Sequence, residues 1–327
     1  MLSKPRTDHA YWLSEFIRLE NELGGPDPHL ATVGKMLELD PELDPAWCIG
    51  CYALGYNVPT GEVIWQNWTQ RAVLDNPFTF TKWVEDHWEG MGLRRERRAV
   101  RTPAKFSRCL ISYARWLNDA GVQDWWYADD FPTAWREVSK IYGMGRYVLL
   151  KLVEGLCRYD GREFHQSDIR AHSGASPREG LSLLYPEHTL WLTSDDNTKS
   201  TVAHVEDLAT RLRNRLAENY GVTVDYFTLQ VVLCEYKKVS QGKQYPGRTH
   251  DTELAYYRAS QKYWGNESRM LEARAAVFPN RILGEQRGWG GKREELSRTL
   301  PDHGYLWTDL SYDYWSTRDL AHPVVWP

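Results

Sequence analysis

The 327-residue sequence has few cysteines, no long apolar run and no basic excess. Five cysteines, an odd number in a chain of this size, argue against a disulfide framework and predict a reducing, cytoplasmic environment. Because no apolar stretch approaches the length of a signal core or a membrane span, we expect a soluble protein with no membrane partner. The net charge of −4 means that bulk charge alone gives no indication of nucleic-acid binding.

Recognisable metal sites are also lacking. Cys48 and Cys51 form a single C-x-x-C, without the second pair at the spacing that a zinc site needs. We therefore interpret them as two small apolar residues of a helix. The sequence predicts no resident cofactor, although a phosphate-bearing substrate can recruit Mg²⁺ without a dedicated protein site.

Apolar residues recur at helical spacing along most of the chain, and tryptophan and tyrosine are abundant. The pattern predicts a mainly α fold, with Thr60 as the cap of one helix and residues 223–227 as a possible short strand. An irregular tail is expected from about residue 284. The predicted helices cover 12–23, 47–56, 60–68, 106–117, 131–142, 146–159, 202–216 and 229–236.

The most informative local element is the Gly143-Met144-Gly145 turn between two predicted helices. Glycines permit a tight turn, and the unpaired N–H groups that begin the next helix can bind a phosphate. Gly143, Gly145, Arg146 and Tyr147 are therefore candidate DNA-binding residues. A turn of this kind without any ligand is the open alternative.

A basic stretch precedes the hairpin. From Arg94 to Arg115 the chain has eight lysines or arginines and one acid, Glu96, which stands out in a chain that is negative overall. Because arginine can hold a phosphate through two hydrogen bonds, this composition favours phosphate binding over a solvated helix face. The phosphate-binding candidates are Arg94, Arg97, Arg98, Arg101 and Lys105.

A second polar region, residues 233–251, lies beside an apolar run. Glu235 and Asp251 are candidate general bases, and Lys237 is a candidate for binding a carboxylate or a phosphate. A helix end with salt bridges, followed by a Pro-Gly turn, explains the same residues without any function.

The hairpin and the Asp168 that follows it resemble the helix-hairpin-helix superfamily of DNA glycosylases. The resemblance implies a two-lobed helical fold and places Asp168 near an extruded base. Tyr147 stands where strand-nicking members have a nucleophilic lysine, and the four-cysteine iron–sulfur motif of some members is lacking. Strand nicking is therefore not expected. The lobes implied for the single compact helical unit 1–327 are 40–165, ending in the hairpin, and 1–39 with 166–327, which includes the tail.

A closer resemblance is to the phage family of amino acid:DNA transferases, also described as α-glutamyl/putrescinyl-thymine pyrophosphorylases. It covers about residues 40 to 260 and is carried by 47–60, 94–105, 143–147, 167–170 and 233–251. It implies double-stranded phage DNA as substrate, in the cytoplasm of an infected bacterium. An amino acid such as glycine, or another amine, would replace the phosphate or pyrophosphate on the 5-methylene of a 5-hydroxymethyluracil base.

The resemblance also implies roles for the candidate residues. Asp168 or Glu235 would deprotonate the incoming ammonium, Arg170 or Lys237 would hold the amino-acid carboxylate, and the arginine cluster would hold the departing phosphate. Transient addition of a cysteine such as Cys234 to the pyrimidine ring is an alternative route. Two other functions stay open: a monofunctional glycosylase for a modified base and a helical DNA-binding protein without activity.

Overall fold

The structure is a computed structural model of the whole chain, and it describes residues 9–22, 25–91, 102–119, 131–161, 168–169, 175–189, 192, 198–240, 257 and 269–277. These residues form helices and turns, with no strand among them. The prediction of a mainly α fold is confirmed. The short strand considered at 223–227 is not found, because α14 begins at Tyr226. The predicted tail from residue 284 lies outside the described residues.

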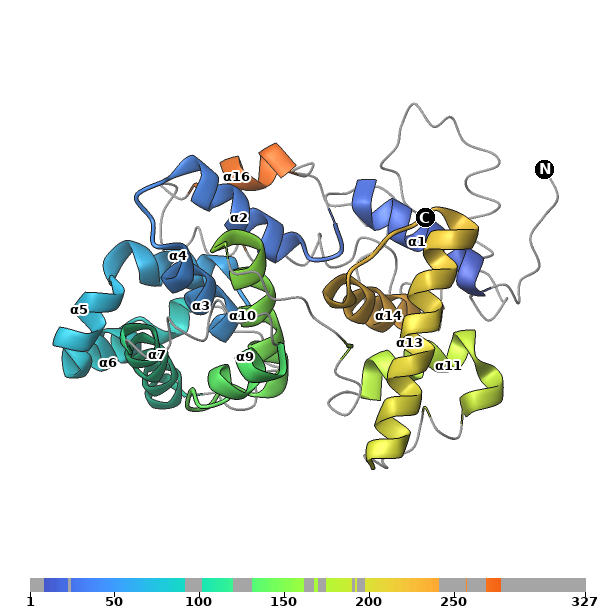
Figure 1. Cartoon of the computed structure of the whole chain (residues 1–327). Coiled ribbons are helices and arrows are strands. Elements are labelled where there is room, and N and C mark those ends of the chain that lie inside the picture. The colour runs from blue at the N-terminus through green and yellow to red at the C-terminus, as the bar shows by residue number, and fades with distance from the viewer. Residues whose placement is uncertain are drawn as a thin grey trace. The chain divides into compact units, whose positions relative to one another are not determined.

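The described residues divide into two compact units (Figure 1). Residues 28–165 and 252–280 belong to the first, the hairpin unit, and residues 1–27 and 166–251 to the second, the α13–α14 unit. The lobes predicted from the sequence stay a prediction. The hairpin unit contains α2 (Pro28–Leu39), α3 (Pro45–Gly55), α4 (Val58–Asn67), α5 (Gln70–Asp75), α6 (Pro77–Asp86), η1 (Trp88–Gly90), α7 (Pro103–Asn118), α9 (Phe131–Val138), α10 (Arg146–Tyr159) and α16 (Met270–Val277).

The core of the hairpin unit is built around α3, which packs against α4, α7 and α10. Asp44 caps the first turn of α3 and Pro45 occupies it, so the sequence fixes where this helix begins. Every residue from Ala46 to Gly55 is buried. A Cβ at Gly50 would overlap the Tyr113 ring, so this glycine allows α7 to approach α3 closely. The position of α7 matters because it supports the hairpin.

The predicted start of α4 was wrong. Thr60 was expected to cap the helix, but α4 begins at Val58 and Asn57 is its cap. The Asn57 side chain accepts a hydrogen bond from the Thr60 backbone N–H at 3.0 Å. Pro59 lies in the first turn of α4, where its missing N–H costs no helical hydrogen bond.

The α13–α14 unit contains α1 (His9–Glu22), α11 (Ala175–Leu184), η4 (Pro186–His188), α13 (Lys199–Tyr220) and α14 (Tyr226–Ser240). Apolar residues of α1, α13 and α14 recur at helical spacing and form one buried cluster. α11 packs on α14 at Gly180, where a Cβ would lie 2.5 Å from the Leu233 carbonyl oxygen. Members of the cluster include Leu13, Phe16, Ile17, Ile169, Leu181, Leu208, Leu212, Leu229 and Tyr236.

None of the described helices combines the length and the apolar character that a bilayer crossing requires.

Candidate functional site

The hairpin turn joins α9 to α10 within the hairpin unit. Gly143 has a φ of +74°, in the region that favours glycine, and Gly145 stands immediately before α10 with an extended backbone. Because Gly145 has no side chain, no side-chain group caps α10. No side chain at Gly145 competes for the N–H groups of the first turn of α10, and N–H groups at a helix N-terminus can bind an acceptor such as a phosphate oxygen.

The helix before the turn is shorter than predicted. We expected it to reach Tyr142, but α9 ends at Val138. The N–H groups of Lys140 and Ile141 bond to carbonyls three residues back, at 3.1 Å each, which tightens the chain beyond helical geometry. The N–H of Tyr142 then leaves the helix and donates to Ser112 Oγ of α7 at 3.0 Å.

The turn also rests on α7 at Gly143, which gives a testable expectation. A Cβ at this position would overlap Cys109 Sγ, and the positive φ disfavours any L side chain. We expect Gly143→Ala to lower the free energy of unfolding by about 2 to 4 kcal/mol, the sum of backbone strain and overpacking. Urea unfolding followed by tryptophan fluorescence measures the change.

Gly145→Ala is the matched control. Gly145 has a negative φ and no atom within 4 Å of its added Cβ. Its replacement should cost less than about 1 kcal/mol, because only the preference at the helix cap changes. Equal losses in the two variants would contradict the close contact between Gly143 and α7.

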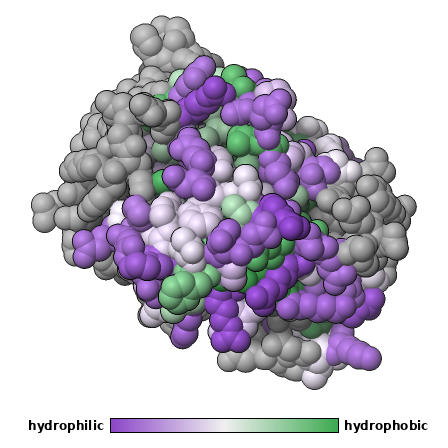
Figure 2. All heavy atoms as spheres, turned by 90° about the vertical axis from the view of Figure 1, so that its left-hand side faces the viewer, coloured by the Kyte–Doolittle hydropathy of each residue, from purple (hydrophilic) through white to green (hydrophobic). Residues whose placement is uncertain are grey.

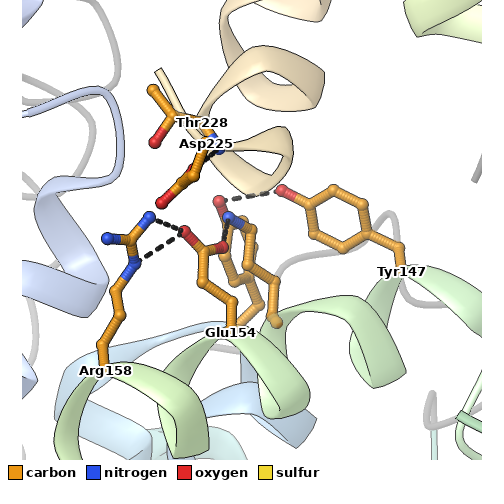
Figure 3. A network of polar contacts seen from close by, with 7 residues as sticks. Tyr147, Glu154, Arg158, Asp225 and Thr228 are labelled. Atoms are coloured by element: carbon orange, nitrogen blue, oxygen red, sulfur yellow. Dashed lines mark hydrogen bonds and ion pairs between the residues drawn. The ribbon is translucent and has the colours of Figure 1, made fainter. Parts of the chain in front are cut away.

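A polar stripe runs along α10 behind the turn: Tyr147, Lys151, Glu154 and Arg158, each three or four residues from the next. Lys151 Nζ lies 2.8 Å from Glu154 Oε2, and Arg158 Nη2 lies 3.1 Å from Glu154 Oε1. The Lys151 and Glu154 side chains are 0% and 4% exposed. Figure 3 shows Arg158 reaching the Glu154 carboxylate, with Tyr147 at the other end of the network.

Tyr147 links this stripe to the end of α3. Its hydroxyl lies 2.9 Å from the hydroxyl of Tyr56, and the two rings meet edge to face with centroids 5.3 Å apart. Lys151 Nζ lies 5.8 Å from the centre of the Tyr147 ring, within cation–π range. Tyr56 itself has a φ of 46° where α3 ends, so this tyrosine is held in an uncommon backbone conformation.

The stripe contains two cations and one carboxylate, which leaves it with one net positive charge. Burying ion pairs seldom adds stability over apolar residues of the same size. Clusters of buried charge are therefore candidates for function. Sequence reasoning missed this group because it considered only the apolar face of the helix. The sequence did contain an indication of this group, because Lys151, Glu154 and Arg158 recur at helical spacing on the face opposite the apolar one.

Asp168 lies in the α13–α14 unit and is half-buried. The next residue, Ile169, is fully buried, and its backbone N–H donates to Glu206 Oε2 of α13 at 2.8 Å. The burial of Ile169 and its hydrogen bond to Glu206 hold the backbone beside Asp168 against α13. The carboxyl group of Asp168 is thus carried on an anchored segment, as a group with a precise task requires.

The structure does not bring Glu235 and Lys237 together. They are two positions apart on α14 and so do not face each other. Glu235 pairs with Lys238 at 2.7 Å, whereas Lys237 binds Glu179 of α11 at 2.7 Å and Ser176 at 3.0 Å. Both contacts of Lys237 tie α11 to α14. The proposed chemical roles of the two residues stay predictions.

The thiols of Cys48, Cys51 and Cys234 are poor nucleophiles. Burial raises the pKa of Cys234 to about 11, with Ser176 lowering it and Glu235 raising it by smaller amounts. Burial also raises the pKa of Cys48 and of Cys51 well above the ordinary value, because both lie in the core helix α3. A protonated thiol reacts slowly at neutral pH, which weighs against the alternative route through Cys234.

Several predicted site residues lie outside the described residues. Lys105 is described: it is exposed in the first turn of α7, and its backbone N–H donates to Thr102 Oγ1 at 3.3 Å. The described residues hold no group of three or more side chains that could bind a metal ion. Outside the description are Arg94, Arg97, Arg98, Arg101, Arg170, Asp251 and the side chain of Arg146.

Comparison with known families decides what kind of protein this is. Residues 54–245 match the model of the amino acid:DNA transferase family. The chain belongs to the amino acid:DNA transferase family. The matched range covers more than half of the sequence. No curated protein and no solved structure matches the chain.

Membership of the amino acid:DNA transferases makes the chain an enzyme, a transferase that modifies DNA bases with an amino acid. Its substrates are DNA and an amino acid. The matched range includes the hairpin turn, the α10 stripe, Asp168 and all of α14, and it ends before Asp251.

Proposed function

We propose that the protein transfers an amino acid, such as glycine, or another amine onto the 5-methylene of a 5-hydroxymethyluracil base in phage DNA. The base carries a phosphate or pyrophosphate, which the amine displaces. The observation that carries the proposal is the family match over residues 54–245, which supplies both the transferase class and the two substrates. The phage-infected bacterial cytoplasm is the proposed place of action.

The reaction is a substitution at the methylene carbon. The amine nitrogen forms a bond to this carbon, the carbon–oxygen bond breaks, and the phosphate leaves with the bonding electron pair. The incoming ammonium must first lose a proton, because a protonated nitrogen has no electron pair to attack with. We assign this proton to Asp168, because the resemblance to the glycosylases places this carboxylate near the extruded base.

Cations must stabilise the departing phosphate and hold the amino-acid carboxylate. We assign the phosphate to the arginine cluster of residues 94–101. For the carboxylate, binding at Lys237 would require displacement of Glu179. Arg170, two residues after Asp168, is therefore the better candidate.

The hairpin would hold the DNA during this chemistry. The target base has to leave the stack, which costs a few kcal/mol. Backbone contacts at the uncapped start of α10 can offset this cost, since helix N-termini bind phosphate groups. We propose that Tyr147, which is 38% exposed at the same helix end, contacts the strand.

Mass spectrometry of nucleosides tests the proposal. The protein is incubated with duplex DNA containing phosphorylated 5-hydroxymethyluracil and with a pool of amino acids, and the DNA is then digested. We expect a modified nucleoside whose mass has lost phosphate and gained one amino acid. Free base together with abasic sites would instead identify a glycosylase, and unchanged nucleosides on bound DNA would identify a binding protein without activity.

A further inference from the structure

The helix α7 presents exposed charges of one sign only. Its 16 residues include Lys105, Arg108 and Arg115 and no aspartate or glutamate. All three cations are exposed, and none forms an ion pair with a described residue. At 3.6 residues per turn they lie within about 80° of one another around the helix axis, so they form one stripe, the α7 stripe.

The α7 stripe is joined to the hairpin turn by direct contacts. The Arg108 guanidinium lies over the Tyr142 ring, 3.9 Å from its centre. Ser112, on the same side of α7, accepts the hydrogen bond from the Tyr142 backbone. Stacking restrains the guanidinium while its N–H edge remains able to bind an oxyanion. The α7 stripe and the turn therefore belong to one continuous surface of the hairpin unit.

Neighbouring helices show what an ordinary solvated face looks like in this protein. On α5, Arg71 pairs with Asp75 at 2.9 Å, and on α6, Lys82 pairs with Asp86 at 3.3 Å. Cations on these helices are neutralised one turn away. The α7 stripe lacks such carboxylates, so its positive charge is available to a partner.

The partner's chemistry follows from this charge. In Figure 2, which faces the side of Figure 1 where α5 and α6 lie, hydrophilic side chains cover most of the described surface. Hydrophobic side chains form only small patches in this view, which is unlike a surface for apolar protein docking. A row of cations without an ion pair to any described residue, beside a phosphate-binding type of turn, fits a polyanion, and DNA is the polyanion on which this family acts.

We propose that Lys105, Arg108 and Arg115 bind phosphates of the DNA strand that lies on the hairpin turn. Ten residues of helix separate the first from the last, a span of about 15 Å at 1.5 Å per residue. Such a span equals about four nucleotides at 3.4 Å each. The inference rests on the proposed function only in taking DNA as the substrate, and it concerns how the strand is held rather than what is transferred.

The salt dependence of binding tests the α7 stripe. Affinity for a short, fluorescently labelled duplex of unmodified DNA is measured by anisotropy at several salt concentrations between about 50 and 200 mM. Each phosphate contact contributes about 0.9 to the slope of log affinity against log salt. We expect each single glutamine variant to reduce the slope by about 0.9, and the variant K105Q/R108Q/R115Q by about 2.7.

Arg71→Gln is the matched control, since it removes an exposed cation that already has a carboxylate partner. Its slope should equal that of the unsubstituted protein. If the unsubstituted protein binds normally and the slope of the triple variant is unchanged, the α7 stripe does not bind DNA phosphates. This result would not contradict the proposed transfer reaction. A reduced slope together with no nucleoside product would support the stripe and count against the transfer.

Discussion

An Asp168→Asn variant should transfer the amino acid about 10² to 10⁴ times more slowly, the range that general-base catalysis contributes. The amide cannot take the proton that the incoming ammonium must lose. The backbone of this segment should stay in place, because Ile169 is buried and its N–H is bonded to Glu206. Quantifying the modified nucleoside over time gives the rate.

Asp207→Asn is a suitable control for this rate. Asp207 also lies in the α13–α14 unit, on α13, but its side chain is 47% exposed and pairs with Arg211. We expect its substitution to change the rate little. DNA affinity should stay the same in both variants, because both residues belong to the α13–α14 unit and the proposed DNA contacts belong to the hairpin unit. Transfer by Asp168→Asn at the normal rate would remove Asp168 from the mechanism.

Helices with a strong apolar stripe were predictable from the sequence. α7, α10, α13 and α14 were all expected, because each buries one face and repeats apolar residues every three or four positions. α5 and α6 were not expected. They are only six and ten residues long, shorter than the window of about 11 residues over which a helical period can be recognised.

The ends of elements were harder to predict, because neighbouring parts of the chain decide them. α9 ends early since Ser112, thirty positions before Tyr142, accepts a backbone hydrogen bond that would otherwise continue the helix. At α4, two residues compete as caps, and Asn57 is better placed than Thr60 once Pro59 occupies the first turn. Local propensity gives the element but not its last residue.

Parts of the candidate site could also be predicted from the sequence, and other parts could not. The glycine turn could be recognised, since Gly143 and Gly145 meet backbone requirements that other residues meet poorly. The partner of Lys237 could not, because Glu179 is 58 residues away and sequence gives no distance between them. The ionic group on α10 was overlooked for another reason. Charged residues at helical spacing usually face water, and only the fold shows that Lys151 and Glu154 are buried.

Removing the carboxylate of this buried pair should be the most destabilising single change we can name. We expect Glu154→Leu to lower the free energy of unfolding by about 3 to 5 kcal/mol, because a buried ammonium loses its ion pair. Lys151 is fully buried, so water cannot replace the lost carboxylate without opening the structure. Urea unfolding measures the loss.

A double-mutant cycle isolates the pair itself. Lys151→Met combined with Glu154→Leu leaves apolar side chains of similar volume, and replacements of this kind are often neutral or stabilising. We therefore expect the double variant to recover most of the stability lost in Glu154→Leu. Asp86→Leu is the exposed control: its partner Lys82 is 65% exposed, so the expected loss is under about 1 kcal/mol.

The activity of the double variant then decides why the charges are present. A stable double variant that no longer transfers the amino acid would mean that the ion pair serves the reaction or DNA binding, since its removal cost no stability. A stable and fully active double variant would contradict a functional role for the α10 stripe. Loss of stability in the double variant, equal to that in Glu154→Leu, would show that the pair is structural and that its surroundings do not accept apolar replacements.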